Sequence, residues 1–222
     1  MTVLSEVAAF GDHFDITRPA PSAAPSLRQL SGDPAAVRAE VETTAGMLAA
    51  RTGVPVDRID RRAAASTVHL GLAARIVAPL IGAVALGGEV PFATAELVLH
   101  RLASGSLVLS AGDGGAEDDV IATLAAVNDA FAAAASLSRV VLWGNAGSAI
   151  ATAAAMVLRA RPAAGAPARR AAEALLAHPR LAPTGAYRGG AWHRRSCCLY
   201  YRIPGGGLCG DCVLAERSPA RA

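Results

Sequence analysis

The chain has 222 residues, of which 53% are hydrophobic, only 4% aromatic and 18% charged. This length suits one domain with an appendage, and it buries a core without help from disulfides. The apolar residues are mostly Ala, Val and Leu, which favours packed helices and excludes a disordered chain. The net charge of +3 is small and every cation is Arg, so we expect no nucleic-acid partner.

The N-terminal residues and the apolar runs indicate in which cellular compartment the protein is expected. The first residues lack the basic and long apolar regions of a secretory signal. The longest uncharged apolar runs, 76–88 and 146–158, are shorter than a membrane span. We therefore expect no transmembrane segment and a cytoplasmic protein, with peripheral contact at the inner face of the membrane left open. Cytoplasmic thiols stay reduced, so clustered cysteines favour a metal site over disulfides.

The first clear element is a helix. The segment 17–31 contains several prolines and is expected to be an irregular lead-in. Asp33 followed by Pro34 is typical of an N-cap and a first helical position, and predicts a helix over 35–52. Gly53 is expected to end that helix.

The middle of the chain is also mainly helical. A second helix is expected from about 57 to 86, with a kink at Pro79 and a buried second half. The segments 96–102 and 107–110 flank a Ser-Gly turn and predict one β-hairpin. Later helices are expected over three ranges: 116–136, 138–161 and 168–178.

The composition changes sharply at Gly185. All four cysteines, all three tyrosines and one of the two tryptophans follow that residue. We therefore predict two parts, a helical scaffold over 1–184 and a cysteine-rich segment over 185–222. The predicted fold class is mainly α with a small β-hairpin, an α+β arrangement.

The cysteines form one constellation: Cys197-Cys198, ten further residues, then Cys209-x-x-Cys212. Four thiolates are the donor set of a [2Fe–2S] cluster, a [4Fe–4S] cluster or a structural zinc ion. Adjacent cysteine side chains diverge and rarely close on one small tetrahedral ion, so the spacing favours a diiron cluster. The glycines of 204–207 predict a tight turn whose amides face cluster sulfurs. The residues alone leave three alternatives open: a zinc site, disulfides, and a metal site with a purely structural role.

A family resemblance adds to this interpretation. The segment from Ser196-Cys-Cys-Leu-Tyr-Tyr-Arg202 to Cys209-Gly-Asp-Cys-Val-Leu214 resembles the C-terminal cluster motif of FhuF-like ferric-siderophore reductases. Members of that family carry a [2Fe–2S] cluster on a Cys-Cys-x10-Cys-x2-Cys arrangement. Internal stretches are similar to family signatures as well: Arg62–Ser66, Gly71–Arg75 and Leu142–Ser148.

The resemblance implies a ligand set, a cofactor and a reaction. Cys197, Cys198, Cys209 and Cys212 would be the metal ligands of a [2Fe–2S] cluster, with no catalytic residue beyond it. The implied reaction is one-electron reduction of siderophore-bound iron(III) to iron(II), which releases iron in the cytoplasm. Its partners would be a ferric siderophore as substrate and an unidentified electron donor, a reductase or ferredoxin-like protein. The absence of hydrolase, Walker and dinucleotide motifs is consistent with this chemistry.

Two other functions remain as alternatives: an iron–sulfur electron-transfer or sensor module acting on a protein partner, and a zinc-stapled structural protein. Positive charge near the cysteines would favour any function that uses a reduced cluster, because a cluster becomes more negative on reduction. Arg194, Arg195 and Arg202 are therefore expected to favour the reduced state, or else to be solvated or paired with Asp211 and Glu216.

For a few residues outside the cysteine segment we predict structural roles only. His69 is expected to be a polar residue on a helix. Trp143 and Asn145 are expected to pack and cap, while Gly144 and Gly147 allow close approach of another segment.

Overall fold

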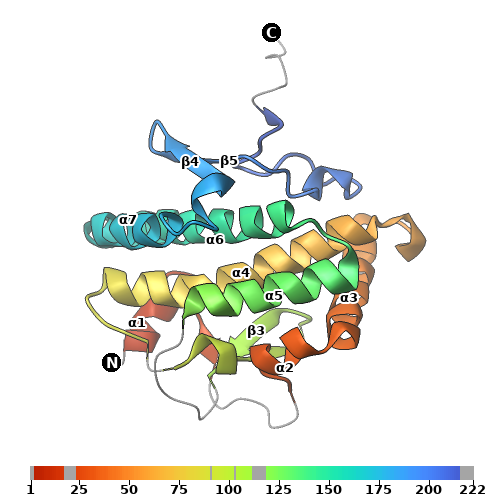
Figure 1. Ribbon diagram of the computed structural model, residues 1–222, viewed down its shortest axis with the longest axis horizontal. Coiled ribbons are helices and arrows are strands. Elements are labelled where there is room, and N and C mark those ends of the chain that lie inside the picture. Colours follow the sequence, from red (N-terminus) through yellow and green to blue (C-terminus); the bar gives the residue numbers. More distant parts are fainter. Residues whose placement is uncertain (1–2, 18–23, 91, 103, 112–118, 216–222) are drawn as a thin grey trace.

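The computed structural model describes residues 3–17, 24–90, 92–102, 104–111 and 119–215. These residues form seven α-helices and two small sheets (Figure 1). The predicted fold class, mainly helical with a small hairpin, is confirmed. The central helix α4 (Arg61–Ala85) packs against α3 (Pro34–Thr52), α5 (Val120–Ala135), α6 (Arg139–Ala160) and α7 (Pro162–Leu176).

Local capping explains where the predicted helices begin and end. The Asp33 carboxylate accepts hydrogen bonds from the first amides of α3, and Gly53 ends that helix at φ 69°, as predicted. Helix α4 begins at Arg61 rather than near residue 57, because Asp60 caps it and a separate 3₁₀ turn, Val56–Arg58, precedes it. The expected burial of its second half is confirmed, and the helix continues without a break through Pro79.

The later helices differ from expectation mainly at their starts. Helix α5 begins at Val120 with Asp119 as its cap, and the expected start at 116–118 lies outside the described residues. Helix α6 begins at Arg139 and ends at Ala160, close to the predicted range 138–161, and Ser138 is its N-cap. Helix α7 begins at Pro162, not at residue 168, because proline suits a first helical turn.

Several short elements were not predicted. Helices α1 (Val3–Ala8) and α2 (Leu27–Gly32) lie within or before the stretch expected to be irregular. Helix α2 forms because Ser26 and Gln29 make a reciprocal capping box, a signal that the sequence does contain. Strand β1 (Ile16–Thr17) pairs in parallel with β3 (Leu107–Ser110).

Two hairpins are present where one was expected. The predicted hairpin pairs β2 (Val98–Arg101) with β3, and Leu99 lies opposite Leu109. The unpredicted hairpin pairs β4 (Gly185–Arg188) with β5 (Ala191–Arg194). Its turn is Gly189-Gly190, both at positive φ, which is the chemistry of a tight two-residue hairpin. It marks the start of the cysteine-rich segment.

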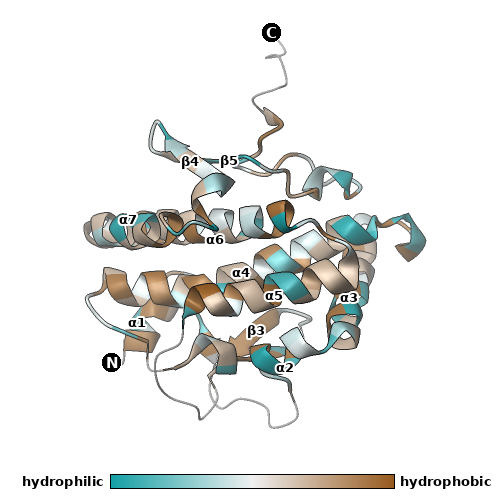
Figure 2. Ribbon diagram, viewed as in Figure 1, coloured by the Kyte–Doolittle hydropathy of each residue, from teal (hydrophilic) through white to brown (hydrophobic). Residues whose placement is uncertain are grey.

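The apolar core runs along α4 and α6. Figure 2 shows the C-terminal half of α4 in brown, on the side where it meets the N-terminal segment. Both helices are long and apolar enough to cross a membrane by length and composition, but 67% of each apolar window is buried inside the fold. Core helices of globular proteins satisfy the same test, so the two helices are weak grounds for a membrane span.

A buried histidine interrupts this core. His69 is a polar residue on helix α4, as expected, but it is 0% exposed, which the sequence pattern does not predict. Its Nε2–H donates to Oδ1 of Asn128 on α5 over 2.7 Å. Burial in the apolar interior lowers the pKa of His69 to about 4, and the Asn128 hydrogen bond only partly opposes this effect.

This pKa makes stability fall in mild acid. Between pH 6.5 and about 4 the unfolded state binds a proton at His69 that the folded state does not, so stability decreases as the pH falls through this window. From pH 7 to 5, we expect His69 to lower the melting temperature by roughly 5 °C. His69→Gln should flatten this dependence, measured by thermal denaturation at each pH. His178→Gln, at a partly exposed histidine after α7, should keep the wild-type slope; equal slopes in the two variants would contradict the assignment.

Candidate metal centre

The cysteine-rich segment lies along the outer face of α6. Strands β4 and β5 pack on this helix, and the 3₁₀ helix Tyr200–Arg202 reaches α4 (Figure 1). The backbone between them is irregular, so its position depends on contacts with α6 rather than on a sheet. This helix is therefore the platform on which the cysteines are held.

All four cysteines are free thiols, and two of them are in contact. Cys198 and Cys212 are buried, while Cys197 and Cys209 are partly exposed. The Sγ atoms of Cys198 and Cys209 are 3.4 Å apart, which links the adjacent pair to the Cys209-x-x-Cys212 pair. Among the described residues, no three Cys, His, Asp or Glu side chains converge closely enough to hold one metal ion. The structure thus joins the two pairs at one contact without gathering four sulfurs around a single point.

Backbone amides approach the sulfurs. The Leu199 N–H donates to Cys197 Sγ over 3.3 Å, and the Leu214 N–H donates to Cys212 Sγ over 3.4 Å. The predicted glycine turn is present, with Gly205 and Gly207 at positive φ. The amides that approach sulfur come from residues following the cysteines, however, and not from these glycines. Such N–H groups stabilise negative charge on thiolate sulfur.

The thiols in contact affect each other's ionisation. A hydrogen bond from the Cys209 thiol lowers the pKa of Cys198, and the same bond raises the pKa of Cys209. Burial raises the pKa of Cys197, and the positive charge of Arg194 opposes that rise. One thiolate is therefore favoured at the contact, and a second needs additional positive charge, such as a metal, beside it.

Arg194 provides a buried positive charge beside the cysteines. This residue ends β5 and is only 2% exposed. Its Nη2 donates to Asn145 Oδ1 over 2.9 Å, but Nε and Nη1 have no acceptor in the described part of the chain. Buried guanidinium N–H groups without partners are costly. An anionic four-thiolate cluster next to Arg194 fits this arrangement, because it supplies the missing negative charge.

Asn145 connects Arg194 to the interior of the scaffold. Its Nδ2 donates to the backbone oxygen and the hydroxyl of Ser66 on α4, and it lies 3.4 Å from His69 Nδ1. The expectation that Asn145 caps a helix is wrong, because it lies inside α6 and is completely buried. A polar amide among small apolar residues of a buried helix is the sequence signal for such a role.

Two glycines of α6 allow the segment to approach, as expected. A Cβ on Gly144 would overlap Ser196 Oγ, and a Cβ on Gly147 would overlap Thr184 Oγ1. One turn further along α6, the Ser148 hydroxyl donates to the Asp211 carboxylate. Among the described residues, the Asp211 side chain thus pairs with Ser148, and no ion pair joins it to Arg194, Arg195 or Arg202.

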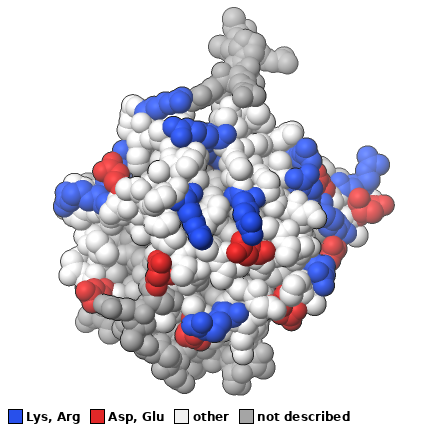
Figure 3. Space-filling model, in the orientation of Figure 1, with Lys and Arg blue, Asp and Glu red and all other residues white. Residues whose placement is uncertain are grey.

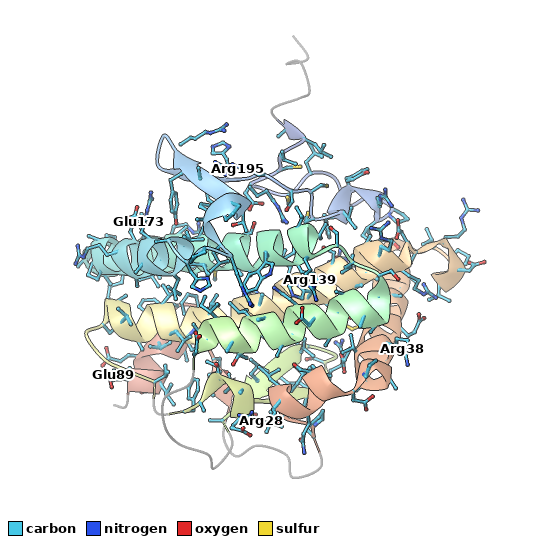
Figure 4. All side chains as sticks on the ribbon, in the orientation of Figure 1. Arg28, Arg38, Glu89, Arg139, Glu173 and Arg195 are labelled. Carbon is cyan, nitrogen blue, oxygen red and sulfur yellow. The ribbon has the colours of Figure 1, made fainter. Side chains whose placement is uncertain are left out.

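The other two arginines lie at the surface. Arg202 forms an ion pair with Asp60 over 3.0 Å. Arg195 is exposed, and its Nη1 donates to the Pro183 oxygen; Figure 4 shows it on the hairpin side of α6. The three arginines expected to act alike are therefore different, and Glu216, a suggested partner, lies outside the described residues. Trp192 packs edge-on against Tyr187, with ring centroids 5.1 Å apart, so both rings contribute to packing within the β4–β5 hairpin.

The geometry defines a helical scaffold protein that holds a segment with four free cysteines over one helix. Residues 194–214 match the family model described as the FhuF 2Fe-2S C-terminal domain. The C-terminal segment is therefore similar to the [2Fe–2S] domain of FhuF-like proteins, and this similarity indicates a [2Fe–2S] cluster as its cofactor. The match does not reach Arg62–Ser66, Gly71–Arg75 or Leu142–Ser148, so the resemblance there stays a prediction. No curated protein matches the chain.

The close approach at Gly144 can be tested by adding one methyl group. Gly144→Ala should displace Ser196 and Arg194 from α6 and destabilise the protein by about 1–3 kcal/mol, as overpacking typically does. Gly46 is exposed and lies in the middle of α3, where an added Cβ would meet no atom within 4 Å. Gly46→Ala should therefore be neutral or slightly stabilising. Thermal denaturation and iron content of both variants measure the effect. Equal behaviour of the two variants would contradict a tight α6 contact.

Proposed function

We propose that this protein is a ferric-siderophore reductase, an oxidoreductase that transfers one electron to siderophore-bound iron(III). The observation that carries the proposal is the matched cysteine segment with a buried, unsatisfied Arg194 beside it. The same segment rests on a rigid helix and contains two partly exposed thiols. A centre of this kind suits electron transfer to a molecule outside the protein.

The proposed ligands are Cys197, Cys198, Cys209 and Cys212. When bound, the [2Fe–2S] cluster supplies a one-electron redox couple. The amides of Leu199 and Leu214 then donate to ligand sulfurs, and Arg194 lies beside them as a fixed positive charge. The side chains of Cys198 and Cys212 are buried, which keeps these two sulfurs from water.

The reaction follows from the chemistry of the substrate. Siderophores hold iron(III) through hard, charged oxygen donors and hold iron(II) far more weakly. One electron added to the metal therefore releases it, with no general base or nucleophile. The electron comes from a separate donor protein, a reductase or a ferredoxin-like protein. We place the reaction in the cytoplasm, after import of the siderophore.

The two proposed parts divide these tasks. Residues 185–222 carry the ligands, and residues 1–184 form the scaffold that supports them. The hairpin at Gly185 and the contacts of Arg194 and Asp211 with α6 support this division. We propose that the two parts fold together, because the buried Arg194 side chain of one part donates to Asn145 of the other.

Loss of one ligand tests the proposal directly. The wild-type protein should contain about two irons per chain and give an electron paramagnetic resonance signal when reduced. Cys209→Ser should lose the signal and release iron(II) from ferric chelates no faster than free reductant does. Leu208→Ala, a change at an exposed neighbouring residue, should keep both properties.

Each alternative function has its own outcome in this experiment. A protein with one zinc ion and no iron would be a zinc-stapled structural protein. A [2Fe–2S] protein that never accelerates iron(II) release would be an electron-transfer or sensor module. Retained activity in Cys209→Ser would contradict the ligand assignment.

The position of Arg194 predicts a shift in reduction potential. Removing a positive charge disfavours the more negative, reduced cluster, so Arg194→Gln should lower the potential by an amount on the order of tens of millivolts. Arg195→Gln should shift it less, since water screens an exposed charge. Potentiometric titration followed by absorbance gives both values, with Arg194→Lys as the charge-preserving control. Equal shifts for Arg194→Gln and Arg195→Gln would refute the special role of the buried charge.

A further inference from the structure

A cavity of about 720 Å³ opens between α6, α7 and the β4–β5 hairpin. Small-molecule sites usually have volumes of about 300–1,000 Å³. The cavity is therefore large enough for a metal chelate with its organic framework. Neither the matched family segment nor the ligand assignment gives it a role.

The wall of this cavity includes part of the proposed cluster loop. Gly210 and Asp211, the residues between Cys209 and Cys212, line it directly. Asp211 is held in place there by the Ser148 hydroxyl. A molecule in the cavity is thus separated from the proposed ligands by no more than the short loop that carries them.

The remaining walls of the cavity consist of small apolar side chains and two aromatic rings. Small side chains of α6, among them Ala151 and Ala155, form one wall. The edge-on pair of Tyr187 and Trp192 forms another. The guanidinium of Arg169 lies over the Tyr187 ring at 3.2 Å, which fixes both side chains. Such a surface packs against the carbon framework of an organic ligand.

The two arginines that line the cavity, Arg169 and Arg159, differ in whether they have a partner. Arg169 is paired with Glu173, its Nε lying 2.7 Å from the carboxylate, and Figure 4 shows Glu173 on α7. Arg159 also lines the cavity and has no ion pair or hydrogen-bond partner within the described ranges. In Figure 3, basic side chains gather on the half of the molecule that carries the hairpin and α6. Arg159 is therefore available to donate to a ligand that carries anionic oxygens.

We propose that this cavity binds the iron(III) chelate that the protein reduces. The inference rests on the proposed function and adds the location of the substrate. Arg159 donates to oxygen donors of the chelate, while Tyr187 and Trp192 contact its carbon framework. The bound iron(III) gains one electron and the reduced protein loses one, and the donor protein restores it.

Two other cavities are poorer candidates. One of about 250 Å³ lies between α3, α4 and the β2–β3 hairpin; it contains Arg101, which is already paired with Glu40. Another of about 190 Å³ borders Ser196 near the start of α6. Both are smaller than most small-molecule sites. Neither is lined by the residues between Cys209 and Cys212.

Gallium(III) chelates test the location without electron transfer, since gallium(III) is not reduced under these conditions. The probes are a trihydroxamate and a tricatecholate complex of gallium(III), each titrated into the cluster-containing protein by calorimetry. Ala155 is exposed and lines the cavity, so Ala155→Trp places an indole there. If the wild type binds one of the two probes, this variant should bind that probe about tenfold more weakly or worse. Ala174→Trp, at an exposed position of α7 outside the cavity, should leave binding within about twofold.

A second pair of variants tests the charge. Arg159→Gln should weaken chelate binding by about fivefold to tenfold, because a charge-assisted hydrogen bond is lost. Arg170→Gln, an exposed arginine of α7 outside the cavity, is the matched control. The reduction potential should stay unchanged in all four variants, which separates substrate binding from damage to the cluster.

The outcomes separate the two proposals. If the wild type binds a gallium chelate and releases iron(II), but Ala155→Trp does both equally well, the cavity is not the substrate site and the reductase function stands. If the wild type neither binds a chelate nor accelerates iron(II) release, the reductase function fails and the cavity assignment fails with it.

Discussion

The cysteine segment depends on one contact, the hydrogen bond between buried Arg194 and Asn145 of α6. Burying a guanidinium is costly unless its N–H groups find acceptors. Asn145 supplies one acceptor, and it is itself held by Ser66 of α4. The contact is sterically possible only because Gly144 has no side chain where Ser196 and Arg194 approach. Nε and Nη1 of Arg194 have no acceptor among the described residues, so an anionic cluster beside them would complete the contact.

The unusual composition of the scaffold serves the same contact. Alanine and glycine make α4 and α6 thin, and thin helices pack closely. Close packing places Ser66, His69 and Asn145 within one hydrogen-bonded group in the centre of an apolar core. A core rich in aromatic residues would separate these helices and break the group. The low aromatic content is thus a property of the scaffold, while Tyr and Trp are concentrated where the cysteine segment packs.

Features specified locally could be predicted from the sequence, and features specified by distant partners could not. The ends of α3 follow from Asp33, Pro34 and Gly53, and the cysteine motif follows from its spacing. The capping box of α2 and the Gly189-Gly190 turn are further local signals that the sequence contains, although neither element is among those predicted. The burial of His69 and the role of Asn145 were beyond sequence patterns, since their partners Asn128 and Arg194 are far away along the chain. Periodicity indicates which helix face is buried, but not which polar atoms meet there.

Helix α6 also sets the relation between the proposed cluster and the proposed substrate cavity. Its residues Gly144 to Ser148 hold the cysteine segment, and its next two turns line the cavity. A helix rises 1.5 Å per residue, so Ser148 and Ala155 are about 10 Å apart along one rigid rod. Asp211 belongs to both regions, because it is bonded to Ser148 and also faces the cavity. In the proposed arrangement, α6 therefore sets the spacing between the substrate cavity and the segment that carries the proposed ligands.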